Sequence, residues 1–172
     1  IVPVTTNPCV LTDIPVGKPL DFYVRAVNND EEKSYWSIPV TYIPDKLHWT
    51  EVVTSQPKGY HEDAQGNIYI SSAKGMAWLS SVVNGLNGAI RPDLTGKDIY
   101  IMTDIDLSDY RWTPLGTSEG FSGCELNGNN HTISGLYCND LEYYMGLIGM
   151  MQNGTVSNLN LVQCNVYGED CN

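Results

Sequence analysis

A short internal repeat in the C-terminal half constrains the fold more than any other feature of the sequence. Residues 131–136 (HTISGL) match residues 154–159 (GTVSNL), so that His131 falls on Gly154 and Leu136 on Leu159. A self-match of this kind is typical of repeat architectures, in which one turn of the backbone stacks on the next. Asn and Gly between the β-prone pieces favour bends, because both residues tolerate left-handed backbone angles. The pattern predicts a parallel β-helix in which residues 132–136 stack in register on residues 155–159.

The same region resembles the GLUG-motif β-helix proteins. The pieces that carry the resemblance are GFSG at 120–123, LNG at 126–128, HTISGL at 131–136 and GLIG at 146–149, preceded by DIDL at 104–107 and WTPLG at 112–116. The resemblance covers approximately residues 68–166. Members of that family are mostly large secreted or surface proteins of bacteria, often described as adhesins, and the motif has no catalytic residues of its own. The resemblance therefore implies a fold and a location rather than an activity.

The stretch from residue 1 to residue 44 carries a different pattern. Residues 20–28 alternate between apolar and polar types, which predicts a strand with one buried face, and residues 35–42 predict a second strand after the polar turn at 29–33. This hairpin resembles the last strands of a fibronectin type III domain. A complete sandwich of that kind needs about 100 residues. We therefore expect residues 1–44 to be a partial fibronectin type III-like β-sandwich.

The remaining domain boundaries follow from these patterns. Residues 45–67 contain Pro, Gly and scattered polar residues, and are predicted to be a linker. Residues 68–172 are predicted to form the N-terminal rungs of a right-handed parallel β-helix, which makes the chain mainly all-β. No capping segment follows the last repeat, and an uncapped solenoid exposes its final rung to pairing with other chains. We therefore expect the native protein to continue beyond Asn172.

One helix is predicted, at about residues 73–84. Ser71 or Ser72 can cap its start, and Gly85 is a typical stop signal. Apolar residues occupy more than one stripe of this segment, so we expect burial on several sides. Such a helix suits the open end of a β-helix, where it covers the core of the first rung. The alternative is an ordinary core helix of a small α+β domain.

The net charge of the chain narrows the class of partner that it can bind. Nine Lys and Arg against twenty Asp and Glu give a net charge of −11, which argues against binding of a nucleic-acid backbone. No apolar run approaches the roughly 18 residues of a membrane span.

The five cysteines include no zinc-finger spacing. A local disulfide between Cys164 and Cys171 is one reading, and buried thiols that act as small apolar residues are the other.

Aromatic side chains in the β-helix region are the predicted ligand-binding residues, because rings on a flat β wall can stack on sugars or on protein partners. The candidates are Trp112, Tyr137, Tyr143, Tyr144 and Tyr167. The alternative is that tyrosine is frequent in β-structure by propensity alone.

Asp104, Asp106 and Asp109 form the most concentrated acidic cluster. Carboxylate oxygens are ligands that Ca²⁺ prefers, so this segment is a candidate calcium site. The alternative is a turn in which the carboxylates accept backbone N–H groups. No other metal and no cofactor is predicted.

The sequence contains no nucleophile elbow, phosphate-binding loop, dinucleotide fingerprint or metalloprotease histidine pair. We therefore expect a non-catalytic segment of a secreted or cell-surface bacterial protein, which acts in adhesion by binding a glycan or a host protein. One alternative is an enzyme that acts on polysaccharide, which rests on fold analogy alone. The other is a passive structural stalk.

Overall fold

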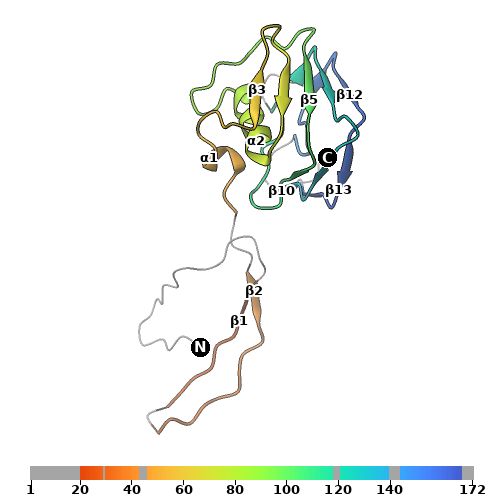
Figure 1. Cartoon of the computed structure of the whole chain (residues 1–172). Helices are drawn as coiled ribbons and strands as arrows, with labels where there is room; N and C mark the ends of the chain where they lie inside the picture. Colours follow the sequence, from red (N-terminus) through yellow and green to blue (C-terminus); the bar gives the residue numbers. More distant parts are fainter. Residues whose placement is uncertain (1–19, 29, 43–45, 118–120, 140–143, 168–172) are drawn as a thin grey trace. The chain divides into compact units, whose positions relative to one another are not determined.

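The computed structural model describes residues 20–28, 30–42, 46–117, 121–139 and 144–167 (Figure 1). The chain divides into two compact units, residues 1–46 and residues 47–172. Short strands dominate the described part, so the fold is mainly β. None of the described helices is long and apolar enough to cross a membrane.

The first unit contains the predicted hairpin. Strand β1 (Leu20–Phe22) pairs antiparallel with β2 (Val40–Tyr42), and an isolated bridge joins Val27 to Lys33 near the turn. The regular strands are shorter than predicted. The residues of this hairpin whose exposure the structure describes are all exposed or half-buried, so the predicted buried face is absent among them.

The prediction of a linker at 45–67 is wrong from residue 47 onward, where the second unit begins. This stretch contains helix α1 (Trp49–Val52) and strand β3 (Tyr60–Glu62), and β3 pairs antiparallel with β4 (Ile68–Ile70). The first residue of α1 and the first residue of β3 are buried. The Nε1 of Trp49 also donates a hydrogen bond to the carbonyl of Leu107 at 3.0 Å. Isolated buried aromatics between polar residues give no periodic pattern, which is why the sequence does not reveal them.

Helix α2 (Ala73–Asn84) begins and ends where predicted. The side chain of Ser72 accepts a hydrogen bond from the backbone N–H of Gly75 at 3.0 Å and caps the first turn. Gly85 ends the helix with a left-handed φ of 65°, a conformation that glycine adopts without strain. Burial extends to several sides of α2, which lies beside β3 in Figure 1.

In the rest of the second unit, the described strands form three successive passes of the chain through corresponding positions. Pass 1 contains β5 (Asp98–Ile101), β6 (Ile105–Asp106) and β7 (Phe121–Ser122); pass 2 contains β8 (Glu125–Asn127), β9 (Thr132–Ser134), β10 (Tyr137–Asn139) and β11 (Met151–Gln152); pass 3 contains β12 (Thr155–Ser157), β13 (Asn160–Val162) and β14 (Asn165–Tyr167). Corresponding strands pair in parallel: β5 with β8 and β8 with β12, β6 with β9 and β9 with β13, β7 with β11, and β10 with β14. Strands β4 and β3 extend the first set into a five-stranded sheet with the order β12-β8-β5-β4-β3.

The predicted register between residues 132–136 and 155–159 is wrong. Ile133 pairs with Ile105 of the pass before it and with Leu161 of the pass after it. Val156 instead pairs with Leu126. The two matching sequences therefore lie in different sheets, as β9 and β12. They resemble each other because each is a bend followed by a short strand, and not because they stack.

Candidate functional site

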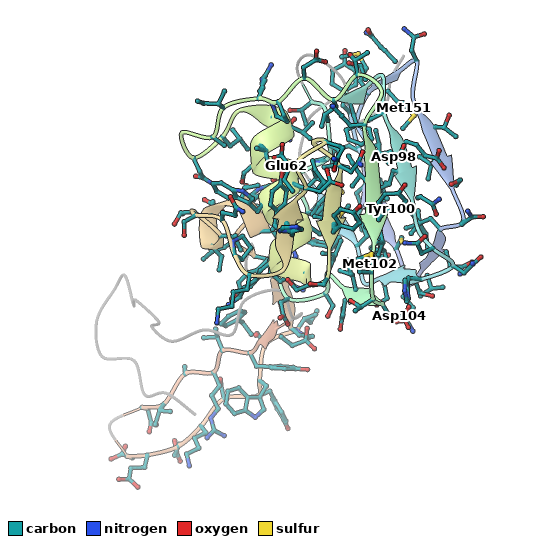
Figure 2. The ribbon with its side chains drawn as sticks, turned by 45° about the horizontal axis from the view of Figure 1, so that its top comes forward. Glu62, Asp98, Tyr100, Met102, Asp104 and Met151 are labelled. Atoms are coloured by element: carbon teal, nitrogen blue, oxygen red, sulfur yellow. The ribbon has the colours of Figure 1, made fainter. Side chains whose placement is uncertain are left out.

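The outward side of the five-stranded sheet is the candidate functional surface. In β4, β5 and β8, residues that enter the core alternate with residues that point away from it, as the side-chain period of two in a strand requires. The outward residues form two rows of register partners across the strands, one of His61, Tyr69, Tyr100, Asn127 and Ser157 and the other of Asp98, Glu125 and Thr155. We call these eight residues the outer wall. Figure 2 shows Asp98, Tyr100, Met102 and Asp104 following one another along β5 and beyond its end.

Two tyrosine rings stack on each other within the outer wall, and the ring of His61 lies tilted beside them. The ring centroids of Tyr69 and Tyr100 lie 5.3 Å apart with an interplanar angle of 23°, and those of His61 and Tyr69 lie 6.1 Å apart. The Tyr–Tyr spacing is close to the separation of neighbouring strands, about 4.8 Å. Rings stacked along the direction of strand pairing turn their faces toward each other, so the wall presents ring edges and hydroxyl groups rather than open ring faces.

The tyrosine hydroxyls are held by carboxylates. Tyr69 donates to Asp63 Oδ2 at 3.1 Å, and Tyr100 donates to Asp98 Oδ2 at 2.9 Å. These two hydrogen bonds are the main reason that the pKa of each tyrosine is raised above its usual value. Between the two rows, Ser157 donates to Glu125 Oε1 at 2.6 Å. The wall therefore carries protonated hydroxyls and fixed, negatively charged oxygens.

The aromatic residues predicted to bind a ligand differ in exposure among those that the structure describes. Trp112 is fully buried and donates from Nε1 to the carbonyl of Leu147 at 3.0 Å, so its prediction as a binding residue is wrong. Tyr137 is half-buried on β10, and Tyr167 is exposed on the paired strand β14. Tyr144 is exposed, and Tyr143 lies outside the described residues.

The sequence contained a signal for the aromatic row that the repeat analysis missed. The tripeptide Ile-Tyr-Ile occurs at 68–70 and again at 99–101. The two copies pair residue by residue in β4 and β5, which places Tyr69 beside Tyr100 and buries the isoleucines on either side of them. This short repeat therefore follows the true register of the sheet, whereas the longer match between 131–136 and 154–159 does not.

The calcium site predicted at Asp104, Asp106 and Asp109 is not formed. Asp104 Oδ1 accepts the backbone N–H of Thr132 at 2.9 Å and lies 3.3 Å from Nδ1 of His131. The hydrogen bond from the N–H of Thr132 lowers the pKa of Asp104 most, and the hydrogen bond with His131 lowers it further. Asp106 Oδ1 accepts the backbone N–H of its neighbour Ser108. Within the described part of the chain, no three His, Cys, Asp or Glu side chains are placed to hold a metal ion, and the alternative of carboxylates that accept backbone N–H groups fits Asp104 and Asp106.

Two of the three described cysteines occupy the core. Cys124 and Cys138 are buried, and burial raises the pKa of the Cys124 thiol to about 11. This agrees with the expectation of small apolar residues inside the rungs. Cys164 is exposed on pass 3, and its predicted disulfide partner Cys171 lies outside the described residues.

The chain was compared with protein-family models, with curated proteins and with solved structures. No family model matches it, and neither of the other two searches found a match.

Proposed function

We propose that the second unit forms rungs of a right-handed parallel β-helix of the GLUG-like kind, with α2 as its capping helix. The parallel pairing of corresponding strands, which recurs in register from one pass to the next, supports this proposal. Side chains of α2 also bond to the backbone of pass 1. Ser80 donates to the carbonyl of Thr113 at 2.7 Å, and Asn84 Nδ2 donates to that of Pro114 at 2.8 Å. The hairpin of the first unit is proposed to belong to a fibronectin type III-like module.

We propose further that the chain is a non-catalytic binding segment of a secreted or cell-surface bacterial protein, and that its ligand is a neutral glycan held on the outer wall. The observation that carries this proposal is the paired row of stacked rings and fixed carboxylates on the five-stranded sheet. Asp98 and Glu125 each use one oxygen in a bond within the sheet, and each carboxylate has a second oxygen that can accept a hydroxyl hydrogen.

The charge of the wall selects the class of glycan. Carboxylates attract a ligand that donates hydrogen bonds and repel one that carries its own carboxylate or sulfate groups. The net charge of −11 acts in the same direction over the whole chain. A neutral, hydroxyl-rich chain laid across the strands satisfies both conditions, and the ring edges of the tyrosines supply apolar contact beside the carboxylates.

The test is a glycan-binding screen that compares neutral with uronate-containing oligosaccharides. We expect saturable binding of neutral glycans and its loss in the double variant Asp98→Asn, Glu125→Gln, which keeps the side-chain shapes and removes both charges. Hydrogen bonds to charged groups contribute about 1.5–3 kcal/mol each, so affinity should fall at least roughly tenfold. Asp109→Asn is the matched control, because it removes one charge from an exposed position outside the outer wall.

Each competing function gives a different outcome in the same screen. Binding that survives in the double variant but is lost in Tyr144→Ala would move the site to the aromatic residues predicted from the sequence. Binding only to a host protein would contradict the proposal that the ligand is a glycan. Release of reducing ends from a bound polysaccharide would contradict the non-catalytic assignment, and no binding at all would favour a passive stalk.

A further inference from the structure

The two rows of the outer wall repeat at a fixed distance from strand to strand. Neighbouring strands of a sheet lie about 4.8 Å apart, and residues two apart along one strand lie about 6.6 Å apart. The central strands β4, β5 and β8 therefore place successive outward side chains at nearly equal steps along a row. Asp98 and Glu125 are register partners, so their carboxylates are one step apart. A ligand that makes the same contact on successive strands must repeat at about this step.

Hydrogen bonds join the two rows to each other. Tyr100 in the first row donates to Asp98 in the second at 2.9 Å, and Ser157 in the first row donates to Glu125 in the second at 2.6 Å. The stacked ring of Tyr69 restricts the rotation of Tyr100. Both carboxylates are therefore held in position before a ligand arrives, and this lowers the entropic cost of binding.

A wall with equal steps selects among neutral glycans by their linkage. In a chain of glucose or mannose units joined by β-1,4 bonds, both bonds to each ring are equatorial. Such a chain is an extended ribbon with hydroxyl groups along its edges, and each sugar advances it by a distance close to the spacing of neighbouring strands. An α-1,4-linked chain has one axial bond per sugar and curves into a helix, so it leaves the plane of the wall. The extended chain is the one that matches the rows.

We propose that the ligand of the outer wall is an extended, unbranched β-1,4-linked chain of neutral pyranoses, which lies along the rows with about one sugar per strand. Because such a chain is a neutral glycan, this proposal rests on the function proposed above and narrows it to one class. Asp98 and Glu125 accept hydroxyl groups of neighbouring sugars through the oxygens that the sheet does not use. The ring edge of Tyr100 contacts the C–H groups of the sugar beside it.

The first experiment compares linkages by isothermal titration calorimetry of the unchanged 172-residue chain, so it does not depend on the folding of any variant. The probes are the β-1,4-linked hexamers of glucose and of mannose. The α-1,4-linked hexamer of glucose is the matched control, because it has the same composition and no charge. We expect at least one β-linked hexamer to bind at least about tenfold more tightly than the control, since a curved chain reaches fewer of the fixed carboxylates.

The second experiment tests whether the ligand follows the strand spacing. The affinity of the unchanged chain should rise from the β-1,4-linked dimer to the tetramer, because a longer chain reaches further strands. Glu125→Gln removes the charge one strand away from Asp98, and should reduce this gain with length. Asp109→Asn, which removes a charge from an exposed position outside the outer wall, should keep the full gain.

Three results would overturn this proposal: equal affinity for the α- and β-linked hexamers, no gain with length, or a gain that Glu125→Gln leaves unchanged. If neutral glycans still lose their binding in the double variant Asp98→Asn, Glu125→Gln, the function of the wall stands and the extended chain alone is wrong. The same holds if another neutral glycan binds and neither β-linked hexamer does. Absence of binding to every neutral glycan would overturn both proposals together.

Discussion

The two ends of the stack of passes are built from similar residues but differ in what covers them. At one end, β4 places Ile68 and Ile70 in the core, β3 pairs with β4, and α2 contacts β3. At the other end of the described strands, Val156 and Leu161 are the register partners of buried Leu126 and Ile133, and both remain about half exposed. The difference teaches that burial in this architecture is decided by the neighbouring pass, and not by the residue type or its position within a strand.

The largest effect on stability is expected at Trp112, which the sequence analysis assigns to a binding surface and the structure places in the core. Trp112→Ala removes a fully buried side chain and its hydrogen bond to Leu147. We expect a loss of about 3–5 kcal/mol in the free energy of unfolding, measured by urea denaturation. Stability within about 1 kcal/mol of the unchanged chain would indicate a surface role and would contradict its place in the core.

The difference between the two ends is tested at one pair of register partners, by comparing the stability of Ile133→Ala with that of Leu161→Ala. Ile133 lies between two passes, so its truncation should cost about 2–5 kcal/mol. Among the described strands, β13 pairs with β9 alone, so the truncation of Leu161 should cost less than half as much. Equal decreases in the urea midpoints of the two variants would show that Leu161 is as well covered as Ile133.

The closed end makes an unusual prediction for Gly75. In the interior of a helix, Gly→Ala normally stabilises by about 1 kcal/mol. Here an added Cβ would overlap the carbonyl of Gly59, where the segment before β3 crosses α2. We therefore expect Gly75→Ala to destabilise by about 1–3 kcal/mol through overpacking. Lys74→Ala, at the exposed neighbouring position, is the control and should change the thermal midpoint little; a stabilised Gly75→Ala variant would disprove the close approach.

The smallest effect is expected at Asp104, an exposed residue of pass 1 whose carboxylate accepts the backbone N–H of Thr132 in pass 2. The pKa of Asp104 is lowered by the N–H of Thr132 and by His131. The ionised form therefore stabilises the fold above the unfolded-state pKa of about 3.9, and this stabilisation is lost as the pH falls through the lower folded-state pKa. Asp104→Asn should be slightly less stable than the unchanged chain at neutral pH and equally stable at low pH. A difference that persists in strong acid would mean that the side chain acts through packing rather than charge.

Local signals predicted local structure well. The cap at Ser72, the stop at Gly85 and the apolar residues between them defined α2, because helix ends depend on nearby residues. The antiparallel hairpin of the first unit followed from two β-prone runs around a polar turn. The mainly β character of the described chain was predicted from the same kind of signal, short β-prone runs separated by bends and turns.

Non-local features were predicted less well. The register failed because short bend-and-strand sequences resemble one another within a pass as much as between passes, so residues 131–136 and 154–159 match without stacking. The repeated Ile-Tyr-Ile tripeptide was the better guide, since it places a side chain of the same type at the same height in both strands. Trp112 was misassigned because a sequence alone does not tell an outward ring from an inward one in an irregular segment.

The register between passes is the central claim, and NMR cross-strand contacts test it most directly. Backbone protons of Ile133 should show contacts to Leu161, and those of Leu126 to Val156, as the parallel pairing of β9 with β13 and of β8 with β12 requires. Contacts between Ile133 and Val156 instead, which stand at equivalent places in the two matching sequences, would contradict the arrangement of passes. The rows of the outer wall, which follow from the same pairing, would then be wrong as well.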